Sequence, residues 1–120
     1  MDVKQFIKDY YENLLTPENL KNFLHPQAII EWHSQRGYVE MDTAEIVKFM
    51  EVVSRNNTTL RFRVTHLVAE GENKVAAKYI NYLESADDLN IEKEVSHGIS
   101  IWELKDNKLY RGYIITNQIS

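Results

Sequence analysis

The chain has 120 residues, a formal net charge of -4 and no cysteine. A chain of this length forms one domain and buries roughly two thirds of its unfolded surface, so it needs no disulfide to fold. The lack of cysteine excludes disulfide and thiolate chemistry, and interspersed charges of both signs exclude the clustered basic face of a nucleic-acid-binding protein. No apolar run approaches membrane-spanning length, and without a signal peptide we expect a cytoplasmic protein.

The beginning of the chain predicts two amphipathic helices. Asp2 followed by Gln5 resembles a capping box, and apolar residues then recur at helical spacing up to residue 14. The run Thr16-Pro17-Glu18 is a second start signal, because Thr caps helices, Pro suits the first helical position and Glu favours the positive end of the dipole. The second helix ends at His25-Pro26, since the residue before a proline is disfavoured in helical conformation.

The next segment predicts a strand, a loop and a third helix. Residues 28–33 form a short strand, and the loop that follows contains Gly37 and a second short strand at Tyr38 to Glu40. Asp42 with Glu45 predicts another capping box, which opens a helix that closes at residues 55–57. Its apolar face consists of Ile46, Phe49, Met50 and Val53.

The C-terminal half predicts an antiparallel meander. Between Leu60 and Ala69 apolar and polar residues alternate, which is the period of a strand with one face in a core. A polar turn with Gly71 leads into a strand at residues 74–84 that is rich in Val, Ile and Tyr. An acidic loop at 85–90, a strand at 92–104 and a tight turn at Asp106-Asn107 precede a last strand at 109–117.

The element order is therefore helix, helix, strand, helix and meander, with no repeat and no linker. This order predicts a single α+β domain over residues 1–120, in which a strongly curved antiparallel sheet wraps around the three helices. The core of this domain should bury Phe6, Phe23, Phe49, Phe62 and Val75.

Several short motifs accompany this order. They are Tyr10-Tyr11, Leu24-His25-Pro26-Gln27-Ala28, the helix Thr43 to Met50, Glu70-Gly71 followed by Lys74 to Tyr79, and the run Trp102 to Leu109. In their order and spacing they resemble the nuclear-transport-factor-2-like superfamily of cone-shaped, cystatin-like folds, and most nearly its SnoaL-like, polyketide cyclase-like members. The resemblance covers nearly the whole chain.

The resemblance implies a pocket inside the cone and a homodimer formed through the outer sheet face. It implies no single reaction, because the superfamily contains isomerases, cyclases, dehydratases, hydrolases and non-catalytic binding modules. In ketosteroid isomerase-like members an Asp base ends the first strand, where this chain has Trp32, and the oxyanion-stabilising acid falls near Ser100. Of the catalytic residues of those members, this chain keeps only a helix-one tyrosine, Tyr10 or Tyr11. We therefore expect no ketosteroid isomerase activity.

Strand alternation predicts which side chains share the pocket, if Trp32 and Trp102 both point inward. Ile80, Tyr82, Ile99 and Ile101 then lie on the outer face. A bulge would reverse the phase of every later residue in its strand. The predicted ligand-binding residues are Tyr10, Trp32, Phe49, His66, Tyr79, Asn81, Ser100, Trp102 and Tyr113.

Each of these residues also has a structural interpretation. The phenylalanines suit an ordinary core, while Trp32 and Trp102 suit a core or a pocket wall equally well. Among the histidines, His25 is expected in a loop and His33 and His97 on the outer face. His66 shares the parity of the inward residues of its strand, and we favour a structural over a catalytic role for it.

Two functions remain open. The first is a SnoaL-like protein that binds a small, mostly apolar molecule in the cone pocket, as an isomerase, cyclase, dehydratase or hydrolase. The alternative is a non-catalytic module that binds an apolar ligand or a protein. No phosphate loop, nucleophile elbow or metal-ligand spacing is present, so we expect no cofactor, no metal and no nucleic acid. An ionisable group in the pocket would distinguish the two.

Overall fold

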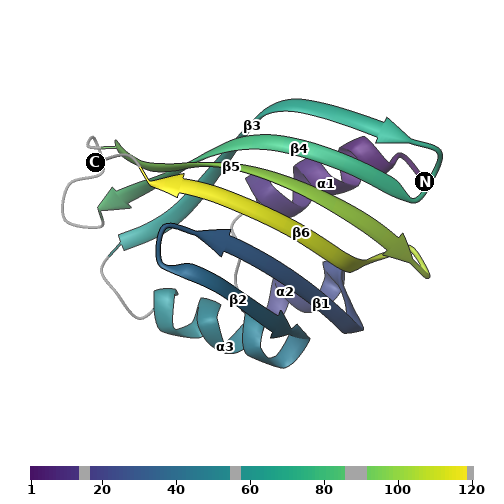
Figure 1. The fold of residues 1–120 in the computed structure, drawn as a ribbon, viewed down its shortest axis with the longest axis horizontal. Helices are drawn as coiled ribbons and strands as arrows, with labels where there is room; N and C mark the ends of the chain where they lie inside the picture. The colour runs from purple at the N-terminus through teal and green to yellow at the C-terminus, as the bar shows by residue number, and fades with distance from the viewer. Residues whose placement is uncertain (14–16, 55–57, 86–91, 119–120) are drawn as a thin grey trace.

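A computed structural model describes residues 1–13, 17–54, 58–85 and 92–118 of the chain (Figure 1). Its helices are α1 (Val3–Glu12), α2 (Pro17–Phe23) and α3 (Thr43–Ser54). Its strands are β1 (Leu24–Ser34), β2 (Gly37–Asp42), β3 (Thr58–Glu70), β4 (Lys74–Ser85), β5 (Glu92–Lys105) and β6 (Lys108–Gln118). The predicted order of elements is confirmed, and both strands before α3 are longer than expected.

The strands form one curved, open sheet in the order β2-β1-β6-β5-β4-β3. Strands β3 to β6 form the predicted meander, and each pairs antiparallel with the next. The sheet is antiparallel as predicted at every pair but one, since β1 pairs parallel to β6. Strand β6 is the last strand of the meander and lies between β5 and β1. It runs antiparallel to β5 and in the same direction as β1. The sheet is therefore mixed.

The predicted capping box is complete at α3, whereas only one of its two hydrogen bonds forms at α1. At α3, Asp42 Oδ1 accepts from Glu45 N at 2.9 Å, and Asp42 N donates to Glu45 Oε1 at 3.3 Å, which completes the capping box. At α1, Asp2 Oδ1 accepts from Gln5 N at 3.2 Å. The Gln5 side chain instead donates to Asp9 Oδ1 at 2.8 Å, one turn further on. The predicted cap of α2 and the closing residues of α3 lie outside the described residues.

All three helices pack on the same face of the sheet, and no helix in the described part of the chain covers the other face (Figure 1). Helix α1 packs on β3 and β4, while α2 and α3 pack against each other and against β1. The largest fully buried side chains are Trp102, Tyr79 and Ile7, which join the sheet to α1. The predicted α+β cone with the helices inside the curved sheet is confirmed.

The predicted core is correct in its centre and wrong at α3. Val75 is buried, and Phe6, Phe23 and Phe62 are partly buried against the core. Phe49 is 40% exposed, because Ile46 and Met50 fill the core side of α3 and Phe49 projects beside them. The Val53 side chain lies outside the described residues. Within the described part of the chain, no helix is long and apolar enough to cross a bilayer.

Candidate functional site

An inner pocket lies between the sheet and the helices, and its volume is about 140 Å³. Side chains from α1, α2, α3 and five of the six strands surround it. None of its described lining residues carries a charge at neutral pH. The lining consists of Tyr10, Tyr11, Leu20, Ile30, Trp32, Met41, Ile46, Phe49, Met50, Phe62, Tyr79, Asn81, Ile114 and Thr116.

A second, outer pocket of about 200 Å³ adjoins the inner one. The two share Trp32, Asn81 and Thr116, so these three side chains stand at the boundary between them. The remaining lining of the outer pocket is mostly polar: Ser34, Gln35, Arg36, Val95, Ser96 and Gln118. The outer pocket therefore adds polar side chains and one charged side chain to a hollow whose inner part is lined mainly by apolar and aromatic groups.

A buried hydrogen-bond network joins α1 to β5 behind the inner pocket. The Tyr11 hydroxyl donates to Ser100 Oγ at 2.8 Å and accepts from Trp102 Nε1 at 3.0 Å. The Tyr11 ring also stacks on Tyr79, with ring centroids 4.4 Å apart. These contacts hold Tyr11 in a single orientation at the pocket wall.

Two glycines make room for the large rings of this region. Gly98 lies opposite Tyr79 in the β4–β5 pair, and Gly112 lies opposite Trp102 in the β5–β6 pair. A Cβ at Gly112 would lie 2.6 Å from the Trp102 ring, and a Cβ at Gly98 would clash with the Tyr79 ring. Each ring therefore lies flat across the neighbouring strand, where only a hydrogen atom leaves it space.

Burial raises the pKa values of the three tyrosines at the inner pocket. Desolvation is the largest cause for Tyr10, Tyr11 and Tyr79, and the neighbouring Tyr11 raises the pKa of the other two further. Hydrogen bonds with Ser100, Trp102 and Tyr79 partly oppose the rise in the pKa of Tyr11. All three hydroxyls are therefore neutral near pH 7, and they act as hydrogen-bonding groups and not as bases.

Two polar contacts hold the boundary between the pockets. Trp32 Nε1 donates to Thr116 Oγ1 at 2.9 Å, which links β1 to β6. Asn81 Nδ2 donates to Ser96 Oγ at 2.8 Å, which links β4 to β5. Asn81 Oδ1 is buried and has no hydrogen-bond partner among the described residues.

Solved structures share this architecture at low sequence identity. IdmH from Streptomyces antibioticus, a candidate polyketide cyclase, superposes with a TM-score of 0.73 at 14% identity, covering 97% of this chain and 92% of its own. A candidate SnoaL-like polyketide cyclase from Jannaschia sp. CCS1 gives 0.67 at 13% identity, covering 93% and 83%. An LEH-like epoxide hydrolase from M. tuberculosis gives 0.67 at 9% identity, covering 94% and 80%. No protein-family model matches the sequence, and no curated protein matches it.

The chain has the SnoaL-like fold. At these identities the likeness concerns the fold, so the site must be judged from this chain's own residues. Trp32, which the resemblance placed where a ketosteroid isomerase-like site has its base, donates from Nε1 to Thr116 Oγ1. Ser100, near the position expected for the oxyanion-stabilising acid, accepts from the Tyr11 hydroxyl.

The SnoaL-like cone brings most of the predicted site residues together. Tyr10, Trp32, Phe49, Tyr79 and Asn81 line the inner pocket. The predicted residues Ser100 and Trp102 are fully buried behind it; Ser100 bonds to Tyr11, and Trp102 contacts both Tyr10 and Tyr11. Tyr11 was not among the predicted site residues, although the Tyr10-Tyr11 pair marked the position. Helical spacing alone does not tell which of two adjacent tyrosines forms hydrogen bonds with β5.

The prediction that His66 points inward is wrong. A bulge in β3 leaves Thr65 without a partner residue, so that Val64 pairs with Tyr79 and His66 with Lys78. The extra residue reverses the phase of the strand. Leu67 then packs against the core, and His66 is exposed.

The prediction that Tyr113 faces the pocket is also wrong. A bulge in β6 leaves Tyr110 without a partner residue on β5, because Glu103 pairs with Arg111 and Leu104 pairs with Leu109. The extra residue reverses the phase of the strand that follows. Gly112 consequently faces inward, and Tyr113 lies on the outer face at 38% exposure. Its hydroxyl donates to Glu103 Oε1 at 3.1 Å.

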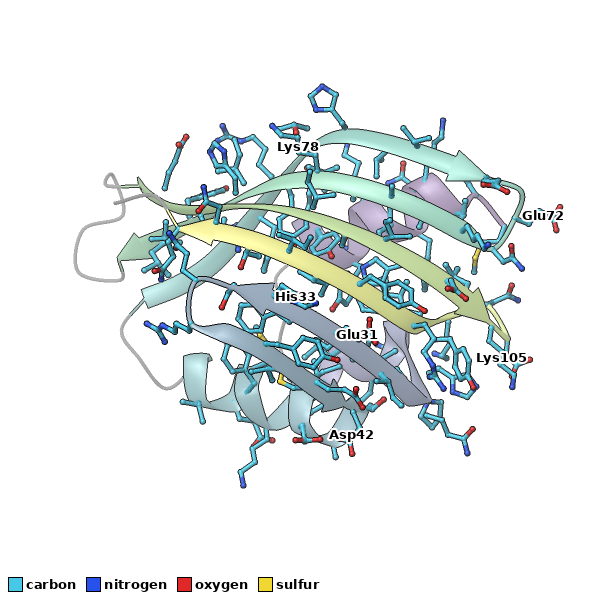
Figure 2. The ribbon with its side chains drawn as sticks, viewed as in Figure 1. Glu31, His33, Asp42, Glu72, Lys78 and Lys105 are labelled. Atoms are coloured by element: carbon cyan, nitrogen blue, oxygen red, sulfur yellow. The ribbon has the colours of Figure 1, made fainter. Side chains whose placement is uncertain are left out.

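The other histidines lie away from both pockets. His33 and His97 are exposed, as predicted, and Figure 2 shows His33 on β1. His25 is not in a loop but in β1, where its Nε2 lies 3.4 Å from Asp106 Oδ2. Within the described part of the chain, no three His, Asp or Glu side chains gather as metal ligands.

Proposed function

We propose that the chain binds a small, planar and mostly apolar molecule, with one ring seated in the inner pocket. The observation that carries this proposal is an apolar hollow of about 140 Å³ with no charged group in its described lining. An engineered cavity of about 150 Å³ with an apolar lining stays dry and binds benzene. The inner pocket thus has the size and character for one six-membered ring.

Aromatic side chains give this pocket flat walls. Trp32 and Phe49 meet edge to face, with ring centroids 5.8 Å apart, and Phe62 meets Tyr79 in the same way at 5.6 Å. Such walls supply a large contact area to a planar guest at low entropic cost. The half-exposed Phe49 lies on the outermost of these walls, so a guest would complete its burial.

The chemistry of the lining supports binding over acid–base catalysis. The ionisable side chains of the inner pocket are tyrosines whose pKa values are raised by burial. A general base needs a pKa near the working pH, and neutral phenols do not meet this condition. For the same reason, we do not expect the protein to isomerise unsaturated steroid ketones.

An enzyme is the second candidate, and the likeness to a candidate polyketide cyclase and an epoxide hydrolase supports it. Such a SnoaL-like isomerase, cyclase, dehydratase or hydrolase would have to work with neutral hydrogen-bonding groups such as Asn81. A protein-interaction module is the remaining alternative, and it requires no guest in the pocket.

Toluene binding tests the proposal. We expect saturable binding of toluene in saturation-transfer NMR and a higher melting temperature in its presence, since a ligand that binds only the folded state stabilises it. Ile114→Phe places a ring inside the pocket and should abolish both effects. Val68→Phe is the control, because Val68 lies on β3 at 67% exposure and lines neither pocket.

Equal toluene binding by wild type and Ile114→Phe would place the guest elsewhere and contradict the proposal. So would a protein that binds no toluene and becomes more stable on Ile114→Phe, because its hollow would then be only a packing defect.

A further inference from the structure

The Asn81 amide has one satisfied end and one free end. Its Nδ2 donates to Ser96 Oγ at 2.8 Å, which holds the amide against β5. Its Oδ1 is buried without a partner among the described residues, although Asn81 lines both pockets. A buried acceptor without a donor is costly, and native proteins rarely keep one without a reason. A donor supplied by a bound molecule would remove this cost.

The mouth of the outer pocket carries a positive charge. Arg36 is the one charged residue among the described residues that line either pocket. It lies in the turn between β1 and β2, where its backbone N–H donates to Ser34 Oγ at 3.2 Å. The neighbouring Gln35 Oε1 accepts from Gln118 N at 2.8 Å, which ties this turn to the end of β6. Arg36 therefore belongs to an anchored turn that lines the outer pocket.

We infer that the guest is an aromatic hydroxy acid: its ring occupies the inner pocket, its hydroxyl donates to Asn81 Oδ1, and its carboxylate reaches Arg36. This inference rests on the proposed function and deepens it. The lining residues supply the three chemistries in two adjoining pockets: apolar walls in the inner one, the Asn81 amide shared by both, and Arg36 in the outer one. Arginine suits the last place, because its planar fork matches a carboxylate.

Three matched probes separate the contributions of the hydroxyl and the carboxylate. 3-Phenyllactate carries a ring, a hydroxyl and a carboxylate; 3-phenylpropionate lacks the hydroxyl; methyl 3-phenyllactate lacks the charge. Isothermal titration calorimetry should show 3-phenyllactate binding about tenfold more tightly than 3-phenylpropionate, because the latter leaves Asn81 Oδ1 unpaired. The preference over the ester should be about threefold and should disappear in high salt, since Arg36 is exposed.

Variants assign each preference to its residue. Asn81→Leu should abolish the preference for the hydroxyl, whereas Asn117→Leu, the same change on an exposed residue of β6, should keep it. Arg36→Met should abolish the preference for the charge. Lys105→Met should keep it, because Lys105 lies at the opposite end of the sheet (Figure 2).

The outcomes distinguish this inference from the proposed function. If toluene binds and the three phenyl probes bind equally, the inference is wrong and the proposed function stands. If neither toluene nor any phenyl probe binds, both are wrong. If Asn81→Leu does not fold, the comparison of the three probes on the wild-type protein still decides the role of the hydroxyl.

Discussion

The Tyr11 hydroxyl shows how one atom can connect distant parts of the chain. It bonds to Ser100 and Trp102, which lie on alternate positions of β5 and are both fully buried. The Tyr11 hydroxyl donates once and accepts once. It therefore stays hydrogen-bonded although Tyr11, Ser100 and Trp102 are all buried. Desolvation nevertheless makes ionisation of Tyr11 and its neighbours Tyr10 and Tyr79 unfavourable.

These tyrosines predict a loss of stability in alkali. Below about pH 10 both the folded and the unfolded chain keep the three phenolic protons, and stability is complete. Above that pH the unfolded chain loses protons that the folded chain retains, because the folded pKa values are raised. The free energy of unfolding should then fall by about 1.4 kcal/mol per pH unit for each tyrosine. Urea unfolding between about pH 9 and about pH 12 measures this slope.

Tyr10→Phe should reduce the alkaline slope by about one third, since it removes one of the three titrating hydroxyls and leaves the Tyr11 hydrogen bonds intact. An unchanged slope in this variant would show that Tyr10 titrates alike in the folded and unfolded chain.

At the level of elements, strand pairing and ring packing depend on each other. Gly98 and Gly112 face the rings of Tyr79 and Trp102 across neighbouring strands. Glycine weakens a strand by its flexibility, but here it lets a large ring lie against the backbone. The same two rings support α1 through their contacts with Tyr10 and Tyr11. The sheet and the helix are therefore stabilised by one packing arrangement.

Gly112→Ala should destabilise the protein by about 1 to 3 kcal/mol, because the added Cβ overlaps the Trp102 ring, which is confined on all sides. Urea unfolding at neutral pH checks this. In a double-mutant cycle with Trp102→Phe the two effects should be strongly non-additive, since the smaller ring vacates the space that Ala needs. Simple additivity of the two effects would mean that the clash is relieved elsewhere.

At the level of the whole molecule, the two faces of the sheet differ in what covers them. The inner face is covered by helices, and among the residues that the structure describes no helix covers the outer face (Figure 1). On that outer face Ile99 pairs with Ile115 and Ile101 with Tyr113 across β5 and β6. All four side chains are exposed. A continuous apolar patch of this kind is unusual on a monomer and typical of an interaction surface.

We therefore predict a homodimer formed through the outer face of β5 and β6. Sedimentation at micromolar concentration should give twice the 14.1 kDa mass of one chain. Ile99→Glu should shift the protein to monomer without unfolding it, because Ile99 is 54% exposed in the single chain. Val52→Glu, an equally exposed apolar position on α3, should leave the dimer intact. A wild-type protein that sediments as one chain would contradict this prediction.

The sequence by itself determined the elements, their order and the inward set on β4. Val75 and Tyr79 were predicted to lie inside, and both are buried. The Asp42 and Glu45 pair located the start of α3, since a capping box depends only on residues within one turn. Local periodicity and capping sufficed for these features, because each depends on neighbours along the chain.

Tertiary structure decided the features that depend on partner strands. The bulges at Thr65 and Tyr110 reversed the phase of their strands and moved His66 and Tyr113 to the outer face. A period of two does not reveal where a strand gains an extra residue, because the opposing strand sets that position. The parallel pairing of β1 with β6 and the choice of Tyr11 over Tyr10 for the buried hydrogen bonds likewise arose only when distant segments met.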